Sequence, residues 1–130
     1  MSLLLLDTSV AIALRDADPA TIARYSDLEA PPLLSVVSIV ELEGGVASAS
    51  IGKEERRRAL TNMLALMNVV DFGRREARLY GEIIEANGFA RGRIIDRMIA
   101  ASALAHGAVV ATRNVQGFAD VRDLKVEDWT

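Results

Sequence analysis

The 130-residue sequence contains no cysteine and a single histidine, His106. The absence of cysteine excludes disulfides, thiolate zinc sites and cysteine nucleophiles. One histidine is too few for a multi-histidine metal centre. Its position before Gly107 is typical of a helix C-terminus, so we assign His106 no catalytic role. Any catalysis by this chain must therefore work without thiols or paired histidines.

Long apolar runs are also missing. The run from Leu3 to Leu6 is cut short by Asp7 and has no basic residue before it, unlike a secretory signal. No segment reaches the roughly 18 apolar residues that a membrane span requires. Hydrophobic residues make up 51% of the chain and charged residues 25%, as in globular proteins, and the length predicts a single domain over residues 1–130. We expect a cytoplasmic protein with no membrane partner.

The net charge of −3 is not typical of a nucleic-acid-binding protein, but the charges are unevenly distributed. Residues 53–97 contain ten Lys and Arg against seven Asp and Glu, a net charge of +3, which leaves −6 for the rest of the chain. Such segregation can form a basic face on an acidic protein. Ordinary solvated helix surface explains any single arginine here equally well.

Short apolar runs alternate with longer helical periods along the chain. We expect strands at residues 2–7, 33–37, 69–72, 108–112 and 124–127, and helices after Thr8 and Asp18 and over residues 53–67, 74–86 and 94–106. Ser38, with Glu41 three residues later, matches a capping box and predicts another helix start. This alternation predicts a three-layer α/β fold, in which helices flank a mainly parallel central sheet of four to five strands.

Three acids are expected at one edge of this sheet. Asp7 closes the first strand, Glu41 lies in the first turn of the helix after the second strand, and Asp96 lies in the first turn of the helix before the fourth. Ligands of open α/β sheets bind beyond the carboxyl ends of the strands. Neighbouring carboxylates repel unless a cation neutralises them, and magnesium prefers oxygen ligands. A magnesium ion that activates water for attack on a phosphate needs no side-chain nucleophile.

Each acid also has a purely structural interpretation. Asp7 could cap the following helix, Glu41 could be only the capping-box partner of Ser38, and Asp96 could simply complement a helix dipole. Position alone does not separate these interpretations from a metal site.

Four segments together resemble the motifs of the PIN-domain family, and especially of its VapC-type toxin ribonucleases. They are Leu6-Asp7-Thr8-Ser9-Val10, residues 38–42 followed by Gly45-Val46, residues 95–101, and residues 110–114 followed by Phe118 and Trp129. Any one motif is weak, but four in the right order and spacing over nearly the whole chain are specific. The resemblance implies a PIN fold and an endoribonuclease that depends on magnesium, with manganese as the alternative metal.

The resemblance also assigns roles to residues. The metal-binding acids would be Asp7, Glu41 and Asp96, and the polar residues that support the site would be Thr8, Ser9 and Thr112. The family's fourth acid commonly falls at the position of Asn114, or three residues later, where this chain has Gly117. Asn114 would then be a neutral residue of the catalytic site. We expect one well-occupied metal, with a second only when substrate phosphate is bound.

RNA and protein partners follow from the same resemblance. Arg91 and Arg93 precede Asp96 in a basic loop, and together with Arg113 they are expected to contact RNA phosphates. The implied substrate is a structured cellular RNA, either tRNA or rRNA. The implied partners are a VapB-type antitoxin and a second copy of the chain, which gives a homodimer or a toxin–antitoxin hetero-oligomer. Part of the antitoxin groove would come from apolar residues of the first helices: Ile12, Ile22 and Tyr25.

Other functions stay open at this point. With Asn114 and Gly117 in place of acids, the chain could be a catalytically weak or inactive PIN domain that binds antitoxin or RNA without cutting it. A phosphatase-like enzyme with Asp7 as nucleophile is disfavoured, because no second Asp follows two residues later and no suitable lysine is evident. A dinucleotide-binding fold would need a glycine-rich loop after the first strand, and none is present.

Overall fold

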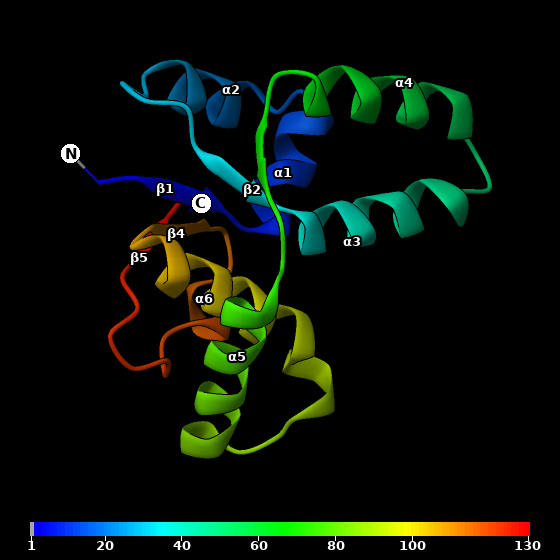
Figure 1. The fold of residues 1–130 in the computed structure, drawn as a ribbon. Helices are drawn as coiled ribbons and strands as arrows, with labels where there is room; N and C mark the ends of the chain where they lie inside the picture. The colour runs from blue at the N-terminus through cyan, green and yellow to red at the C-terminus, as the bar shows by residue number, and fades with distance from the viewer. Residues whose placement is uncertain (1) are drawn as a thin grey trace.

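The computed structural model describes residues 2–130 and contains a five-stranded sheet in which every pairing is parallel (Figure 1). The strand order is β3-β2-β1-β4-β5. The strands are β1 (Leu4–Leu6), β2 (Leu33–Ser35), β3 (Asn68–Val70), β4 (Val109–Thr112) and β5 (Val126–Asp128). The predicted α/β class with a parallel sheet flanked by helices is confirmed.

Residues 2–130 also form six α-helices. They are α1 (Thr8–Arg15), α2 (Pro19–Ser26), α3 (Val36–Ala47), α4 (Lys53–Leu64), α5 (Arg74–Asn87) and α6 (Ile94–His106), with short 3-10 turns η1 (Arg91–Arg93) and η2 (Val115–Gly117). Helices α5 and α6 lie on one side of the sheet and α1 and α2 on the other, while α3 and α4 form a hairpin that projects beyond the sheet (Figure 1). None of the helices within residues 2–130 has both the length and the apolar composition needed to span a bilayer.

Strand β1 contributes to two separate cores, one on each face of the sheet. Leu5 packs into the core beneath α5 and α6, whereas Leu4 and Leu6 pack into the core beneath α1, α3 and α4. Successive side chains of a strand point to opposite faces, so a strand buried on both faces is a continuous apolar run. This double burial explains why the leucine run correctly predicted a central strand.

The start of α3 differs from the prediction. Its N-cap is Ser35, whose hydroxyl accepts a hydrogen bond from the backbone N–H of Val37 at 3.1 Å. Strand β2 therefore ends at Ser35 instead of Val37. Ser38 is fully buried inside α3, so the predicted capping box between Ser38 and Glu41 is wrong.

The start of α1 also differs, by one residue. Asp7 is the N-cap and Thr8 the first helical residue, because the Asp7 side chain accepts a hydrogen bond from the backbone N–H of Thr8; the structural interpretation of Asp7 as a helix cap is thus confirmed. Other helix ends agree with the sequence. Asp18 caps α2 with Pro19 at the first helical position, and Gly107, with a φ of 61°, ends α6 in the left-handed conformation that suits glycine.

Candidate active site

Asp7 lies at the carboxyl edge of the sheet, between β1 and β4. Its backbone N–H donates to the carbonyl of Ala111 at 2.9 Å, which continues the pairing of the two strands. The residue is only 5% exposed. Oδ1 accepts from the backbone N–H of Thr8 (2.7 Å), and Oδ2 accepts from the hydroxyls of Ser9 (2.9 Å) and Thr112 (2.7 Å). Three donors thus hold this carboxylate in one orientation.

The hydroxyls of Ser9 and Thr112 also tie the loop after β4 to Asp7. The backbone N–H of Arg113 donates to Ser9 Oγ at 3.0 Å, and that of Asn114 donates to Thr112 Oγ1 at 2.9 Å. A hydroxyl has one proton to donate and lone pairs to accept with, so each hydroxyl serves both Asp7 and the loop. The three residues predicted as polar support, Thr8, Ser9 and Thr112, therefore all contact a predicted metal-binding acid.

Glu41 approaches from α3. It is the sixth residue of this helix and so lies in the second turn, not in the first turn as predicted. The Thr8 hydroxyl donates to Glu41 Oε1 at 2.5 Å and lies 2.9 Å from the hydroxyl of Ser38. Ser38 is a site residue that the sequence interpretation missed, because its S-x-x-E spacing was assigned to capping. The same i, i+3 spacing also places Ser38 and Glu41 on one face of a helix, which is the signal that could have found it.

Asp96 lies in the first turn of α6, as predicted, and is half-buried. Burial raises the pKa of its carboxyl, and the negative charges of Asp7 and Glu41 raise the pKa further, against the opposing charges of Arg93 and Arg97. Asp7 and Glu41 are therefore both within electrostatic range of Asp96. Within residues 2–130, no three His, Asp or Glu side chains are close enough to grip one ion together. The assignment of these acids as metal ligands stays a prediction.

Gly117 lies against Asp96 where the family pattern places its alternative fourth acid. A Cβ at Gly117 would be 2.6 Å from Asp96 Oδ2 and 3.3 Å from Asn114 Nδ2. Real Cβ atoms essentially never come within 3.0 Å of such a neighbour. Asn114, Gly117 and Asp96 are thus brought together, and no side chain fits at Gly117 unless the Asp96 carboxylate moves.

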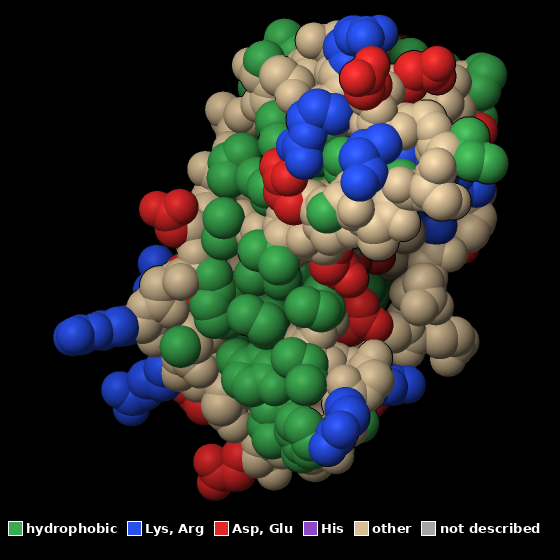
Figure 2. Space-filling view, turned by 90° about the vertical axis from the view of Figure 1, so that its right-hand side faces the viewer, with side chains coloured by type: hydrophobic (Ala, Val, Ile, Leu, Met, Phe, Trp, Pro, Cys, Tyr) green, Lys and Arg blue, Asp and Glu red, His purple; other side chains and the backbone are tan. Residues whose placement is uncertain are grey.

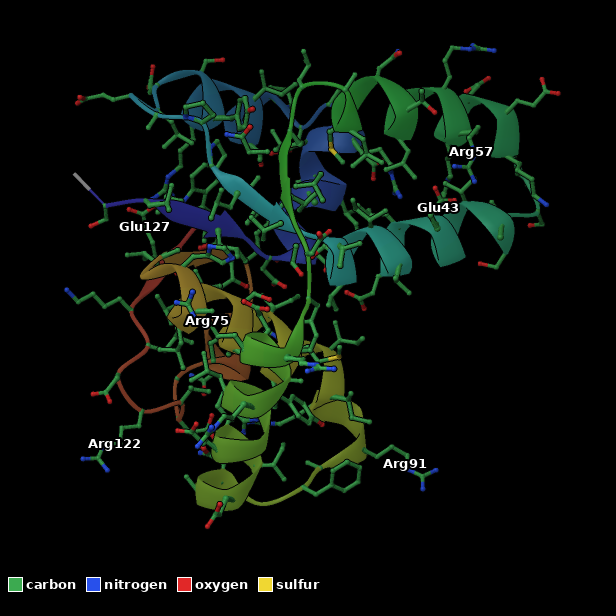
Figure 3. All side chains as sticks on the ribbon, in the orientation of Figure 1. Glu43, Arg57, Arg75, Arg91, Arg122 and Glu127 are labelled. Atoms are coloured by element: carbon green, nitrogen blue, oxygen red, sulfur yellow. The ribbon has the colours of Figure 1, made fainter. Side chains whose placement is uncertain are left out.

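The predicted RNA-binding arginines are placed differently from one another. Arg91 is exposed and points away from the connection between α5 and α6 (Figure 3). The guanidinium of Arg93 already forms an ion pair, since it lies 3.4 Å from the carboxylate of Asp120. Arg113 is exposed in the loop after β4. Contact of these arginines with RNA stays a prediction, with Arg91 and Arg113 the better placed.

One face of the molecule combines apolar and acidic surface. Figure 2 looks onto the side where the α3–α4 hairpin and the α5–α6 connection project. A continuous apolar area lies in its middle, acidic side chains lie beside that area, and Lys and Arg side chains lie above and below. On this face the acidic side chains thus lie between an apolar area and groups of cationic side chains.

Comparisons with known proteins identify the family and the fold. A profile of the PIN domain matches residues 4–124. The chain is 28% identical to Ribonuclease VapC2 of Rickettsia felis and 27% identical to the tRNA(fMet)-specific endonuclease VapC of Salmonella typhimurium, in both cases over 96% of each chain.

Solved structures share the fold. FitAcB from Neisseria gonorrhoeae superposes with a TM-score of 0.81 at 28% identity over 98% of each chain. VapBC2 from Rickettsia felis, bound to a DNA fragment from its promoter, reaches a TM-score of 0.87 at 24% identity over 98% of this chain and 99% of that one, which is a likeness of fold. Because the family profile covers almost the whole sequence, the chain belongs to the PIN-domain family.

Proposed function

We propose that this chain is a magnesium-dependent endoribonuclease that acts as the toxin of a VapBC-type toxin–antitoxin pair. The observation that carries the proposal is the gathering of acids at the carboxyl edge of the sheet: Asp7 is held by Ser9 and Thr112, Thr8 donates to Glu41, and Asp96 lies near enough for both charges to raise its pKa in addition to burial. A divalent cation relieves such repulsion between carboxylates. The relatives named as a ribonuclease and an endonuclease support the reaction class.

The side chains at this edge fit a hard cation. Asp7, Asp96 and Glu41 would hold the ion, one or two of them directly and the remainder through its waters, and all of them offer oxygen, as magnesium and manganese prefer. Magnesium is usually held by one or two carboxylates together with waters, so a closed cage of three acids is not required. Because Asn114 is neutral, we expect one well-occupied ion. When bound, the cation neutralises charge on the scissile phosphate and makes a water more acidic.

The other residues of the site position these acids. Ser9 and Thr112 donate to the same oxygen of Asp7, and Thr8 donates to Glu41. Side chains whose rotamers are fixed in advance need little reorganisation when charge develops during the reaction. The exposed cations Arg91 and Arg113 would contact phosphates on either side of the cleaved bond, which sets the position of the RNA without reading its sequence.

The decisive experiment is RNA cleavage with and without the metal. The name of the Salmonella relative makes tRNA(fMet) the first substrate to test, followed by other tRNAs and rRNA. We expect cleavage in Mg²⁺ or Mn²⁺, no cleavage in EDTA, and a loss of at least about 100-fold in both Asp7→Asn and Asp96→Asn, as for removal of a ligand needed in the transition state. Glu85→Gln, an exposed change on α5, is the matched control. Cleavage that survives EDTA would contradict the proposal.

A second candidate function is favoured by the missing fourth carboxylate. A PIN domain with Asn114 and Gly117 at those positions could bind RNA or antitoxin with little or no turnover. The same samples decide between the two: a gel shift with RNA and saturable Mn²⁺ binding, without any cleavage product, would favour the binding module.

The proposed antitoxin would bind the apolar surface of the first helices. Ile12 and Ile22 are 39% and 40% exposed, and Tyr25 lines a pocket of about 290 Å³. The pocket lies between α1, α2 and α4, and its apolar lining includes Leu14, Met63, Leu66 and Met67.

Co-expression with a candidate VapB-type antitoxin tests this surface. Ile22→Glu should block formation of the complex and leave RNA cleavage intact. Light scattering of the same samples distinguishes a homodimer from a toxin–antitoxin hetero-oligomer. A complex that forms normally with Ile22→Glu would place the antitoxin elsewhere.

A further inference from the structure

An ion pair connects the loop after β4, residues 113–125, to the first turn of α6. Arg97 donates from Nη1 to Asp120 Oδ1 at 2.8 Å and from Nη2 to Asp120 Oδ2 at 2.9 Å. Arg97 is only 3% exposed, whereas the Asp120 side chain is 49% exposed, so the acid reaches in from the surface to a buried guanidinium. A two-pronged pair of this kind fixes orientation as well as distance. Asp120 is therefore committed to α6 and is not free to serve as a fourth acid.

The same loop meets α6 a second time, at the residue before Arg97. Gly117 is buried and lies so close to the carboxylate of Asp96 that an added Cβ would be 2.6 Å from Oδ2. The backbone of Gly117 does not have a positive φ, so the feature that distinguishes this glycine is the close approach of the Asp96 carboxylate and not its backbone conformation. Two residues of the loop, three positions apart, thus contact two adjacent residues of α6.

The loop itself is anchored independently of these contacts. Phe118 is 1% exposed and Val121 is 5% exposed, and both belong to the core beneath α5 and α6. The side chain of Asn87, at the end of α5, donates to the backbone carbonyl of Asp120 at 2.9 Å. The loop is thus fixed to the core on one side and to α6 on the other. A loop fixed in this way can hold the helical turn that carries Asp96 in one position.

We propose that Gly117 and Asp120 are positioning residues for Asp96: Gly117 leaves the space that its carboxylate occupies, and the Asp120–Arg97 pair fixes the helical turn that presents it. The inference rests on the proposed function, since it concerns the acid that would hold the cation. In this chain the position of the missing fourth acid, Gly117, thereby helps to orient the retained acid Asp96.

Binding of Mn²⁺ in the absence of RNA, followed by titration calorimetry or electron paramagnetic resonance, tests the inference without depending on activity. Groups that orient a metal ligand typically change metal affinity by about 10-fold to 100-fold when removed. We expect Gly117→Ala and Asp120→Asn each to weaken Mn²⁺ binding by about 10-fold, and Asp120→Glu, which keeps the charge, to lose less. Asp123→Asn is the matched control, since it is exposed in the same segment and asparagine tolerates its φ of 66°.

Cleavage at high Mn²⁺ gives a second signature. The positioning variants retain Asp96, so saturating Mn²⁺ should restore most of their cleavage, whereas Asp96→Asn should stay inactive. Circular dichroism at the assay temperature identifies folded variants, and if Asp120→Asn is unfolded, Gly117→Ala and Asp120→Glu carry the test.

The possible failures are distinguishable. Folded variants that bind Mn²⁺ as tightly as the wild type overturn the positioning role and leave the proposed function intact. A wild type that binds no Mn²⁺ and cuts no RNA overturns the proposed function, and this inference with it.

Discussion

The strand end that carries Asp7 and the helix turn that carries Asp96 hold their carboxylates in opposite ways. Asp7 accepts one backbone and two hydroxyl hydrogen bonds, which it receives from both β4 and α1. The pKa of Asp96 is raised by burial and by the neighbouring charges of Asp7 and Glu41, and no hydrogen bond contributes to this rise. The protein thus satisfies one acid internally and leaves the other in an unfavourable electrostatic environment. The comparison shows that one acid of a binding site can be stabilised by the protein alone, while another acid is stabilised only when a ligand binds.

Removal of each side chain should separate these roles most clearly. Asp7→Ala deletes a helix cap and leaves the buried hydroxyl of Thr112 without its acceptor, so we expect a loss of about 3 kcal/mol in the free energy of unfolding. Asp96→Ala should change that free energy by no more than about 1 kcal/mol, because it removes an unfavourable charge together with modest packing. Urea denaturation without divalent cations measures both, and equal losses would break the contrast.

Addition of a divalent metal should raise the Tm of the protein only when Asp96 is present to bind the ion with Asp7. A ligand that binds only the folded state stabilises it by about 2.7 kcal/mol at 100 times its Kd. We expect MnCl₂ to raise the Tm of the wild type by several degrees and to leave the Tm of Asp96→Asn almost unchanged. CaCl₂ and NaCl at matched ionic strength are the controls, and an equal rise in the variant would show that Asp96 holds no ion.

The raised pKa of Asp96 gives a prediction with a definite sign. An unfolded aspartate loses its proton near pH 3.8, while Asp96 in the folded chain keeps its proton to a higher pH. Stability therefore falls as pH rises through that window, and the deficit persists at neutral pH. Metal-free Asp96→Asn should have a higher Tm than the wild type at pH 7, and the difference should shrink toward pH 3. A lower Tm for the variant at pH 7 would be the contrary result.

Asp120 should show the smallest effect, with the opposite sign. Its hydrogen bonds from Arg97 lower the pKa of its carboxyl from 3.8 to about 2. The stabilisation is complete above pH 3.8 and is lost as pH falls toward 2, and solvent screening keeps it small because the side chain is half exposed. Acid titration by circular dichroism should show a shallower loss of structure between pH 4 and 2 for Asp120→Asn than for the wild type. Identical curves would show that the pair contributes nothing to stability.

Local patterns in the sequence were sufficient for most of the architecture. Burial on both faces makes β1 a continuous apolar run, and the period of α6 ends at Gly107, so these elements and their order were correctly predicted. The sequence also predicted correctly that Asp7 follows the first strand and that Asp96 lies in the first turn of α6. The start of α3 was wrong because Ser35 and Ser38 both have the chemistry of an N-cap, and only the contact of Ser38 with Thr8 decides between them.

Contacts between distant residues explain what could not be predicted. Arg97 and Asp120 are 23 positions apart, and nothing in the periodicity of α6 indicates that its arginine is buried. The approach of Gly117 to Asp96 depends on how η2 turns beneath α6. Such pairings arise from the three-dimensional path of a loop, and composition and spacing do not encode them locally.

The double-sided burial of β1 also determines how the site responds to motion. Glu41 belongs to the helices on one side of the sheet, Asp96 to the helices on the other, and Asp7 to the strand that both sides share. A shift of either helical layer across the sheet changes the separation of Glu41 and Asp96 while Asp7 stays in place. The packing of the two helical layers on the sheet, together with the contact between α3 and α6, therefore determines how far apart Glu41 and Asp96 lie.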